Sequence, residues 1–252
     1  MTPLRFSANT GFLWKELPFL ERIRRAAANG FDAVEFHDEA QHADPSALAD
    51  TLAEAGLPVL GLNVRMGDTA GCAAIPGYED QARHDIDAAI ATARQVGAQA
   101  VHVLAGRTGS TGDRAAYLRS LHHALDSCDL AILIEPISRA AMPDYFLHDL
   151  DQAAEVIDET GDARLKIMFD CFHVAAEHGA IPERFRQHAG RIGHIQIASY
   201  PDRSEPGRGT IDYAAVLNAF RDGGYDGVFG CEYRPATTVE AGLGWRDRLR
   251  SR

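Results

Sequence analysis

Short apolar runs alternate with longer amphipathic segments along the whole chain. The short runs have the composition of strands buried on both faces of a parallel sheet. We expect such strands at residues 4–9, 32–36, 57–63, 100–104, 130–134, 165–169, 192–195 and 227–231. The segments between them show helical periodicity, at residues 17–29, 45–55, 78–96, 117–127, 147–159, 182–188 and 211–223, with a last segment at 239–249.

Glycines mark the ends of several of these helices. Gly30, Gly56 and Gly97 each follow the last periodic residue of a helix, the position where a left-handed residue closes a helix. Eight strand–helix repeats over 252 residues, without linker-like composition, predict one (β/α)8 TIM barrel domain over residues 1–252. A doubly wound open sheet is the alternative, and it requires a reversal of strand order.

Four strands end in side chains that carry oxygen. These are Glu135, Asp170, Gln196 and Glu232. The active site of a (β/α)8 barrel lies at the carboxyl ends of its strands, so we expect these side chains around a common centre. Asp170 follows a buried run, and His173 lies three residues later on the expected loop. A helix N-cap is the alternative role for Asp170.

This set of side chains favours a divalent metal. Carboxylate and amide oxygens are the ligands that Mg²⁺ and Mn²⁺ prefer, whereas a zinc site would more often include cysteine or histidine. Three carboxylates within a few ångströms could not all remain ionised without a cation.

Composition and charge favour an enzyme that acts on a small molecule. Apolar residues make up 46% of the chain and charged residues 24%, as in ordinary globular proteins. The net charge of -11 argues against binding to nucleic acid or to an anionic membrane. No secretion signal or membrane-spanning run is apparent, and the four cysteines form no close pair, so we expect a cytoplasmic protein with reduced thiols. The sequence is compatible with a homo-oligomer.

An ordered set of segments resembles the hydroxypyruvate isomerase family, one of the xylose-isomerase-like TIM barrels. The segments are residues 5–9 (RFSAN), 30–36 (GFDAVEF), 75–77 (IPG), 134–137 (IEPI), 193–198 (GHIQIA), 230–233 (GCEY) and 240–245 (EAGLGW). The resemblance implies that the metal is bound by Glu135, Asp170, Gln196 and Glu232. It also implies that Glu135 and Glu232 form the acid/base pair, and that His173 and Arg203 contact the substrate.

Three further residues are candidates for substrate binding. Asn63 ends one expected strand and His102 lies in another, although His102 could equally face the barrel interior. Arg65, in the loop after Asn63, is a second candidate besides Arg203 for pairing with a substrate carboxylate, because a guanidinium matches a carboxylate with two hydrogen bonds.

The chain departs from the family pattern in two loops that would shape the pocket. Residues 36–39 (FHDE) replace an apolar or aromatic segment, and the loop after Asn63 is short and lacks a tryptophan. His37 and its polar neighbours indicate a solvated loop. The glycine-rich residues 106–112 lack the Gly-Lys-Ser/Thr ending of a phosphate-binding loop, so we expect an ordinary βα loop.

These observations predict an aldose–ketose isomerase that acts on a small hydroxy-carbonyl acid, such as hydroxypyruvate or a 2-oxotetronate. Two glutamates can move the carbon-bound proton, and a metal can stabilise the enediolate. A keto-sugar 3-epimerase is the closest alternative, but that class is expected to carry histidine at the position of Gln196. A metal-dependent endonuclease is disfavoured by the acidic charge, and a barrel that binds a sugar acid without turnover is a further alternative.

Overall fold

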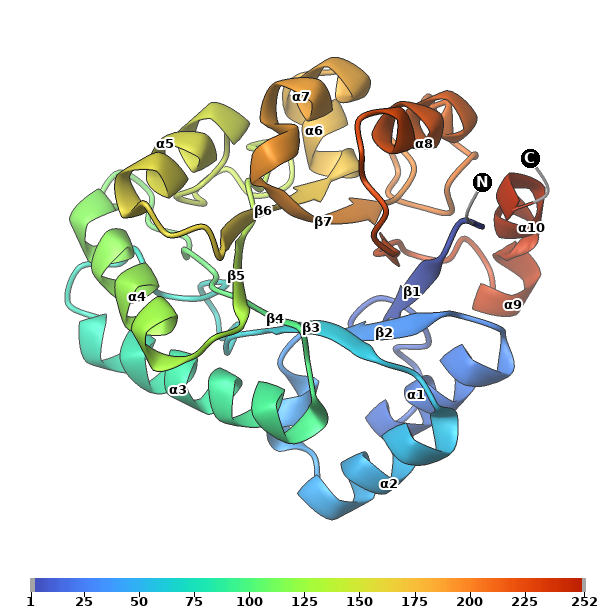
Figure 1. Ribbon diagram of the computed structural model, residues 1–252, viewed down its shortest axis with the longest axis horizontal. Coiled ribbons are helices and arrows are strands. Elements are labelled where there is room, and N and C mark those ends of the chain that lie inside the picture. The colour runs from blue at the N-terminus through green and yellow to red at the C-terminus, as the bar shows by residue number, and fades with distance from the viewer. Residues whose placement is uncertain (1–2, 251–252) are drawn as a thin grey trace.

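The computed structural model describes residues 3–250, which form a closed barrel of eight parallel strands (Figure 1). The strands neighbour one another in chain order, and β1 pairs with β8 to close the ring. They are β1 (Phe6–Asn9), β2 (Ala33–Phe36), β3 (Val59–Asn63), β4 (Ala100–His102), β5 (Ala131–Ile134), β6 (Leu165–Asp170), β7 (Ile192–Ile197) and β8 (Phe229–Cys231). The predicted (β/α)8 TIM barrel is confirmed, and the open doubly wound sheet is wrong.

Helices surround the barrel as an outer ring (Figure 1). They are α1 (Phe19–Ala28), α2 (Pro45–Ala55), α3 (Glu79–Val96), α4 (Arg114–Ser127), α5 (Leu150–Thr160), α6 (Cys171–Glu177), α7 (Ile181–His188), α8 (Tyr213–Asp222), α9 (Val239–Gly242) and α10 (Gly244–Arg250), with 3-10 turns η1 (Glu39–His42) and η2 (Ala189–Arg191). No helix within residues 3–250 combines the length and the apolar composition needed to cross a membrane.

Helix α2 shows how the local sequence determines an element. The Asp44 carboxylate accepts a hydrogen bond from the Ala47 N–H at 2.8 Å, and Pro45 occupies the first turn, where its missing N–H has no cost. At the other end Gly56 has a φ of 63°, which glycine adopts readily. These bounds agree with those expected from the sequence.

Helix α6 differs from the sequence-based expectation. Residues after Asp170 were expected to form a loop, but the helix begins at Cys171, so His173 lies in its first turn. Asp170 Oδ1 accepts a hydrogen bond from the Phe172 N–H at 2.8 Å and caps the helix. Asp170 therefore ends a strand and starts a helix, which the sequence had presented as alternatives.

Aromatic packing fixes the helices against strands β6 and β8. Phe169 of β6 lies edge-on to Phe185 and Phe220, at 6.2 and 5.8 Å between ring centroids, and Phe220 contacts Phe229 of β8. All of these rings are buried. Truncation of such a ring costs about 3–5 kcal/mol, so this cluster holds the two strands that carry Asp170 and Glu232.

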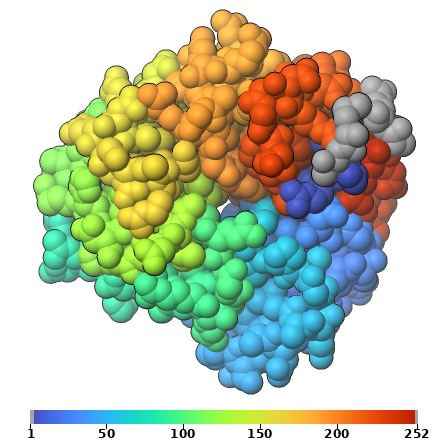
Figure 2. All heavy atoms as spheres, viewed as in Figure 1, coloured from blue at the N-terminus to red at the C-terminus, as the bar shows by residue number. Residues whose placement is uncertain are grey.

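The barrel interior is hollow. A cavity of about 390 Å³ is bordered by residues at the start of several strands, including Arg5, Pro58 and Gln99, and it extends to Glu35 and Gln196. Figure 2 shows a small hollow near the centre of the visible face. The barrel interior below the carboxyl ends of the strands is therefore not fully packed, and both polar and apolar side chains line it.

Candidate active site

The carboxyl ends of the strands bring the predicted carboxylates together. Glu135 follows β5, Asp170 ends β6 and Glu232 follows β8, and all three are buried. Gln196 lies in β7, where it is the register partner of Asp170 on β6. A second cavity, of about 570 Å³, opens at this end and is lined in part by Glu135, His173, Arg203 and Glu232.

Arg203 links two of the carboxylates. Its Nη2 lies 2.9 Å from Asp170 Oδ2 and also pairs with Glu232 Oε2. The guanidinium lies between the rings of Phe12 and Phe172, at 4.7 and 4.9 Å from their centroids. Arg203 has a φ of 53°, a conformation that costs a non-glycine residue roughly 1–3 kcal/mol and is typically maintained at functional sites.

Glu232 is held as a carboxylate by three donors. The Asn9 amide donates to its Oε1 at 3.0 Å, and His37 Nε2 lies 3.2 Å from the same atom. Burial alone would raise the pKa of Glu232, but Arg203 and His37 outweigh it and lower this pKa to about 2. Glu232 is thus ionised at neutral pH.

His37 was expected in a solvated loop, and that prediction is wrong. The imidazole is largely buried beside Glu232, and the hydrogen bond to that carboxylate outweighs burial and raises the pKa of His37. Gly11 makes room for the ring, because a Cβ at that position would overlap it.

Glu135 is in the opposite environment. Burial first, and then the charges of Glu232 and Asp170, hold its pKa well above the usual range. Burial likewise raises the pKa of Asp170 to about 6, although Arg203 opposes this effect. One guanidinium therefore does not compensate three buried carboxylates, and the site favours an additional cation.

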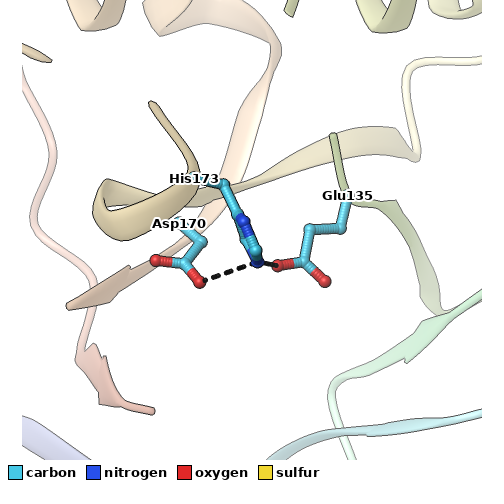
Figure 3. A group of neighbouring side chains, drawn as sticks. All are labelled: Glu135, Asp170 and His173. Atoms are coloured by element: carbon cyan, nitrogen blue, oxygen red, sulfur yellow. Dashed lines mark ion pairs between the residues drawn. The ribbon is translucent and has the colours of Figure 1, made fainter. Parts of the chain in front are cut away.

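His173 faces two of these carboxylates but is suited to donate a hydrogen bond. Its Nε2 lies 3.7 Å from Glu135 Oε1 and 3.6 Å from Asp170 Oδ2 (Figure 3). The backbone N–H of Ser138 donates to its Nδ1 at 3.3 Å. Burial, with Arg203, lowers the pKa of His173 to about 3, so the ring is neutral. The proton of the neutral ring is therefore on Nε2, which points a donor into the site.

The remaining oxygen atoms fit a divalent metal. Among residues 3–250, Glu135 Oε1 and Gln196 Oε1 are buried and have no hydrogen-bond partner. Such atoms are costly to bury unless something binds them. The oxygens of Glu135 and Asp170 also lie close enough together, with His173 Nε2, to surround one ion. Glu135 and Asp170 are common to this group and to the expected set, in which Gln196 and Glu232 would complete the ligands.

Comparison with known proteins identifies the family of the chain. The sequence matches the pattern of the xylose isomerase-like TIM barrel over residues 23–249. The chain belongs to the xylose isomerase-like TIM barrel family.

Members of this family with assigned activities match nearly the whole chain. The 2-oxo-tetronate isomerase of Cupriavidus necator is 39% identical, over 96% of this chain and 96% of that protein. The hydroxypyruvate isomerase of Escherichia coli is 38% identical, over 98% of this chain and 100% of that protein. These relatives confirm the resemblance to hydroxypyruvate isomerases and the prediction of an isomerase.

Two solved structures superpose closely on this chain. One from Brucella melitensis, named as an AP endonuclease of family 2, has a TM-score of 0.92 and 31% identity, and the match covers 98% of this chain and 99% of that one. A 3-keto-D-glucoside 4-epimerase from E. coli has a TM-score of 0.80 at 21% identity, with full coverage of both chains, which shows the shared fold.

Of the other candidate residues, Arg65 lies away from the site, whereas Asn63 lines its cavity and His102 Nε2 lies 4.0 Å from Glu135 Oε2. Arg65 is exposed and borders a separate hollow beside the loop of residues 65–72, so its position does not support contact with the substrate. His102 is buried and lines the interior cavity, where its Nδ1 lies 3.1 Å from Asn63 Oδ1. Asn63 lines both cavities.

Two cations at the cavity mouth were missed by the sequence reasoning. Lys15 and Arg234 are exposed and line the cavity that contains Arg203. Arg234 directly follows the segment of residues 230–233, and its N–H donates to the Arg203 carbonyl at 2.8 Å. Proximity to Glu232 in the sequence was the only indication that could have identified it.

Proposed function

We propose that the protein is a divalent-metal-dependent aldose–ketose isomerase that acts on a small hydroxy-carbonyl acid, with hydroxypyruvate and 2-oxotetronate as the first candidates. The pairing of Glu135 and Glu232 across one cavity, together with the matching relatives, supports this proposal. Two carboxylates that face one cavity are suited to take a proton and to return one.

Glu232 is the group that we assign to removal of the carbon-bound proton. Asn9 and His37 fix its Oε1, so the carboxylate is held in one orientation. The carbon–hydrogen bond of the hydroxymethyl carbon breaks and Glu232 receives the proton; the electron pair forms the carbon–carbon double bond of an enediolate, and the carbonyl π pair moves onto the carbonyl oxygen. Glu135 then delivers a proton to the former carbonyl carbon, while the proton of the terminal hydroxyl passes to the former carbonyl oxygen, so that the terminal carbon becomes the aldehyde. Glu232 afterwards releases its proton to water and Glu135 regains one, and the two glutamates exchange roles in the reverse reaction.

His173 stabilises the charge that develops on oxygen. Its neutral ring presents Nε2–H toward the space between Glu135 and Asp170, where a substrate oxygen can accept a hydrogen bond. A donor fixed in a buried site stabilises an enediolate without reorganisation. A divalent cation held by Glu135, Asp170, Gln196 and Glu232 would polarise the substrate carbonyl and lower the pKa of the adjacent carbon-bound proton.

The acid group of the substrate is matched by the cations of the cavity. Arg203, Lys15 and Arg234 line the same cavity. Arg203 Nε is buried and has no hydrogen-bond partner among residues 3–250, so it is available to a carboxylate.

A panel of substrates tests the proposal. Purified protein with added Mn²⁺ would be assayed for kcat/KM on hydroxypyruvate, 2-oxotetronate and neutral ketohexoses, with products identified by NMR. We expect isomerisation of at least one acid at a much higher kcat/KM than any ketohexose. Epimerisation of a ketohexose at C3 as the dominant activity would contradict the proposal and establish the epimerase alternative.

A further inference from the structure

Glu35 is a buried carboxylate that the expected metal set does not include. It lies in β2, within the barrel wall, and it accepts three hydrogen bonds. Ser7 Oγ donates to Oε1 at 2.6 Å, and the Gln196 amide donates from Nε2 to Oε2 at 2.8 Å. His194 Nε2 lies 3.1 Å from the same Oε2. The Ser7 hydroxyl and the Gln196 NH₂ group both donate to this carboxylate, so Glu35 is the acceptor in each contact.

The contact with Glu35 determines which atom of the Gln196 amide faces the site. A carboxylate accepts hydrogen bonds but cannot donate them, so it selects the NH₂ group of the amide. The amide oxygen must then point the other way. Within residues 3–250, Gln196 Oε1 is buried and has no partner, and Gln196 is in register with Asp170 on β6.

The neighbouring strand is shaped to admit this arrangement. Gly230 of β8 is the register partner of Gln196. A Cβ at Gly230 would overlap Glu35 Oε1 and would lie 2.8 Å from His194 Nε2 and 2.9 Å from Gln196 Cγ. Any larger residue would push the carboxylate away from the amide. The contact is thus built by three strands and does not depend on a flexible surface group.

We propose that Glu35 is a positioning residue, which holds the Gln196 amide so that its Oε1 is presented to the divalent cation. This inference rests on the metal site of the proposed function. A neutral amide is a weaker ligand than a carboxylate, and it binds only through oxygen. If the amide could rotate, half of its orientations would direct NH₂ at the cation. Partners that orient a ligand in this way typically change metal affinity by about 10–100-fold when removed.

Mn²⁺ binding to the metal-depleted full-length protein tests the inference, measured by isothermal titration calorimetry. Glu35→Gln should weaken Mn²⁺ binding by about 10–100-fold, because an amide at position 35 can face either end of the Gln196 amide. The double variant Glu35→Gln/Gln196→Glu should recover most of the affinity. A carboxylate at 196 can accept from the amide at 35 with one oxygen and bind the ion with the other.

Asp85→Asn provides a matched control. Asp85 is a buried carboxylate in α3 that accepts a hydrogen bond from the Gln81 amide at 2.8 Å, outside the barrel. Its replacement makes the same change, from a carboxylate to an amide beside a glutamine amide, and should leave Mn²⁺ affinity unchanged. Glu35→Asp, which keeps the charge but withdraws it from the amide, is a second test if Glu35→Gln folds poorly, and it should also weaken Mn²⁺ binding.

The outcomes separate the inference from the proposed function. Wild-type protein that binds no Mn²⁺ would contradict the proposed function, and with it the inference. Wild-type binding that persists in Glu35→Gln would overturn the inference alone. A double variant no better than Glu35→Gln would also overturn it, because a purely structural loss is not rescued by a second substitution at the partner.

Discussion

The backbone N–H of Ser138 donates to Nδ1 of His173 at 3.3 Å, and this contact places the proton of the neutral imidazole on Nε2, which faces the site. Nδ1 must carry a lone pair to accept, so the neutral ring has its proton on Nε2. His173 is therefore a donor to the substrate in this account, although it lies close to Glu135 and Asp170 (Figure 3).

Replacement of His173 by asparagine should separate the role of donor from that of ligand. The asparagine side-chain oxygen can accept from Ser138 as Nδ1 does, but nothing replaces Nε2–H. We expect kcat to fall by about 10²-fold, as for the loss of one donor to a developing oxyanion, with Mn²⁺ affinity close to wild type. His123→Asn, at a partly exposed histidine on α4 paired with Asp87, is the control. A large loss of Mn²⁺ affinity in His173→Asn would make His173 a metal ligand instead.

The two glutamates should be indispensable for turnover. Glu135→Gln and Glu232→Gln each retain an oxygen but lose the ability to exchange a proton, so we expect kcat to fall by about 10²–10⁴-fold with a smaller change in KM. Glu159→Gln, which affects an exposed ion pair with Arg114, should leave kcat unchanged. Turnover near the wild-type rate in either site variant would show that the acid/base assignment is wrong.

Glu135 and Asp170 should each make a contribution to the stability of the metal-free protein that falls as the pH rises. The pKa of Glu135 is held well above its usual range, and that of Asp170 is raised to about 6, so the folded state binds these protons more tightly than the unfolded chain does. Above the unfolded pKa values the unfolded chain has released its protons. Folding then requires either the uptake of protons or the burial of carboxylates of like charge, and both lower the free energy of unfolding.

Thermal denaturation in EDTA measures this effect. We expect the Tm of Glu135→Gln minus the Tm of the wild type to increase as the pH rises above 4.5, the ordinary pKa of Glu135, because the variant lacks this group and the other titrating groups are common to both proteins. Mn²⁺ competes with protons for the carboxylates and should raise Tm more at the higher pH. A plot of Tm against pH for Glu135→Gln that runs parallel to the wild-type plot would show that burial of the Glu135 carboxylate does not destabilise the protein.

Arg203→Lys should raise KM for an acid substrate much more than for a neutral ketose. The planar guanidinium is held between Phe12 and Phe172 and leaves Nε free to donate, and lysine reproduces neither property. Arg65→Lys, at an exposed position outside the cavity, is the control. An equal rise in KM for both substrates would indicate that Arg203 acts through Asp170 and Glu232 and does not bind the acid group.

The order of the elements could be predicted because each strand and helix carries its own local pattern. Helix α2 is an example, since its cap at Asp44 and its end at Gly56 are determined within the segment itself. The placement of Glu135, Asp170 and Glu232 followed from the general rule that strand ends in a barrel meet at one face.

What could not be predicted depends on contacts between distant segments. His37 lies in a polar run, yet it contacts Glu232, which is 195 residues away. An indication was present in its spacing, because His37 is two residues beyond Glu35 and alternate residues of a strand face the same side. The same spacing relates Arg65 to Asn63, but there the chain turns outward and leaves Arg65 exposed. The sequence offers no means to distinguish these two cases.

The most direct test of the central claim is the fate of hydroxypyruvate in D₂O. Metal-depleted protein would be incubated with the substrate, with and without Mn²⁺, and followed by ¹H NMR against a sample without protein. We predict conversion to tartronate semialdehyde with deuterium entering at the carbon that receives the returned proton, only when Mn²⁺ is present, and no conversion by Glu232→Gln. Conversion at the same rate in EDTA, or no conversion of either hydroxypyruvate or 2-oxotetronate with Mn²⁺ or Mg²⁺, would contradict the account.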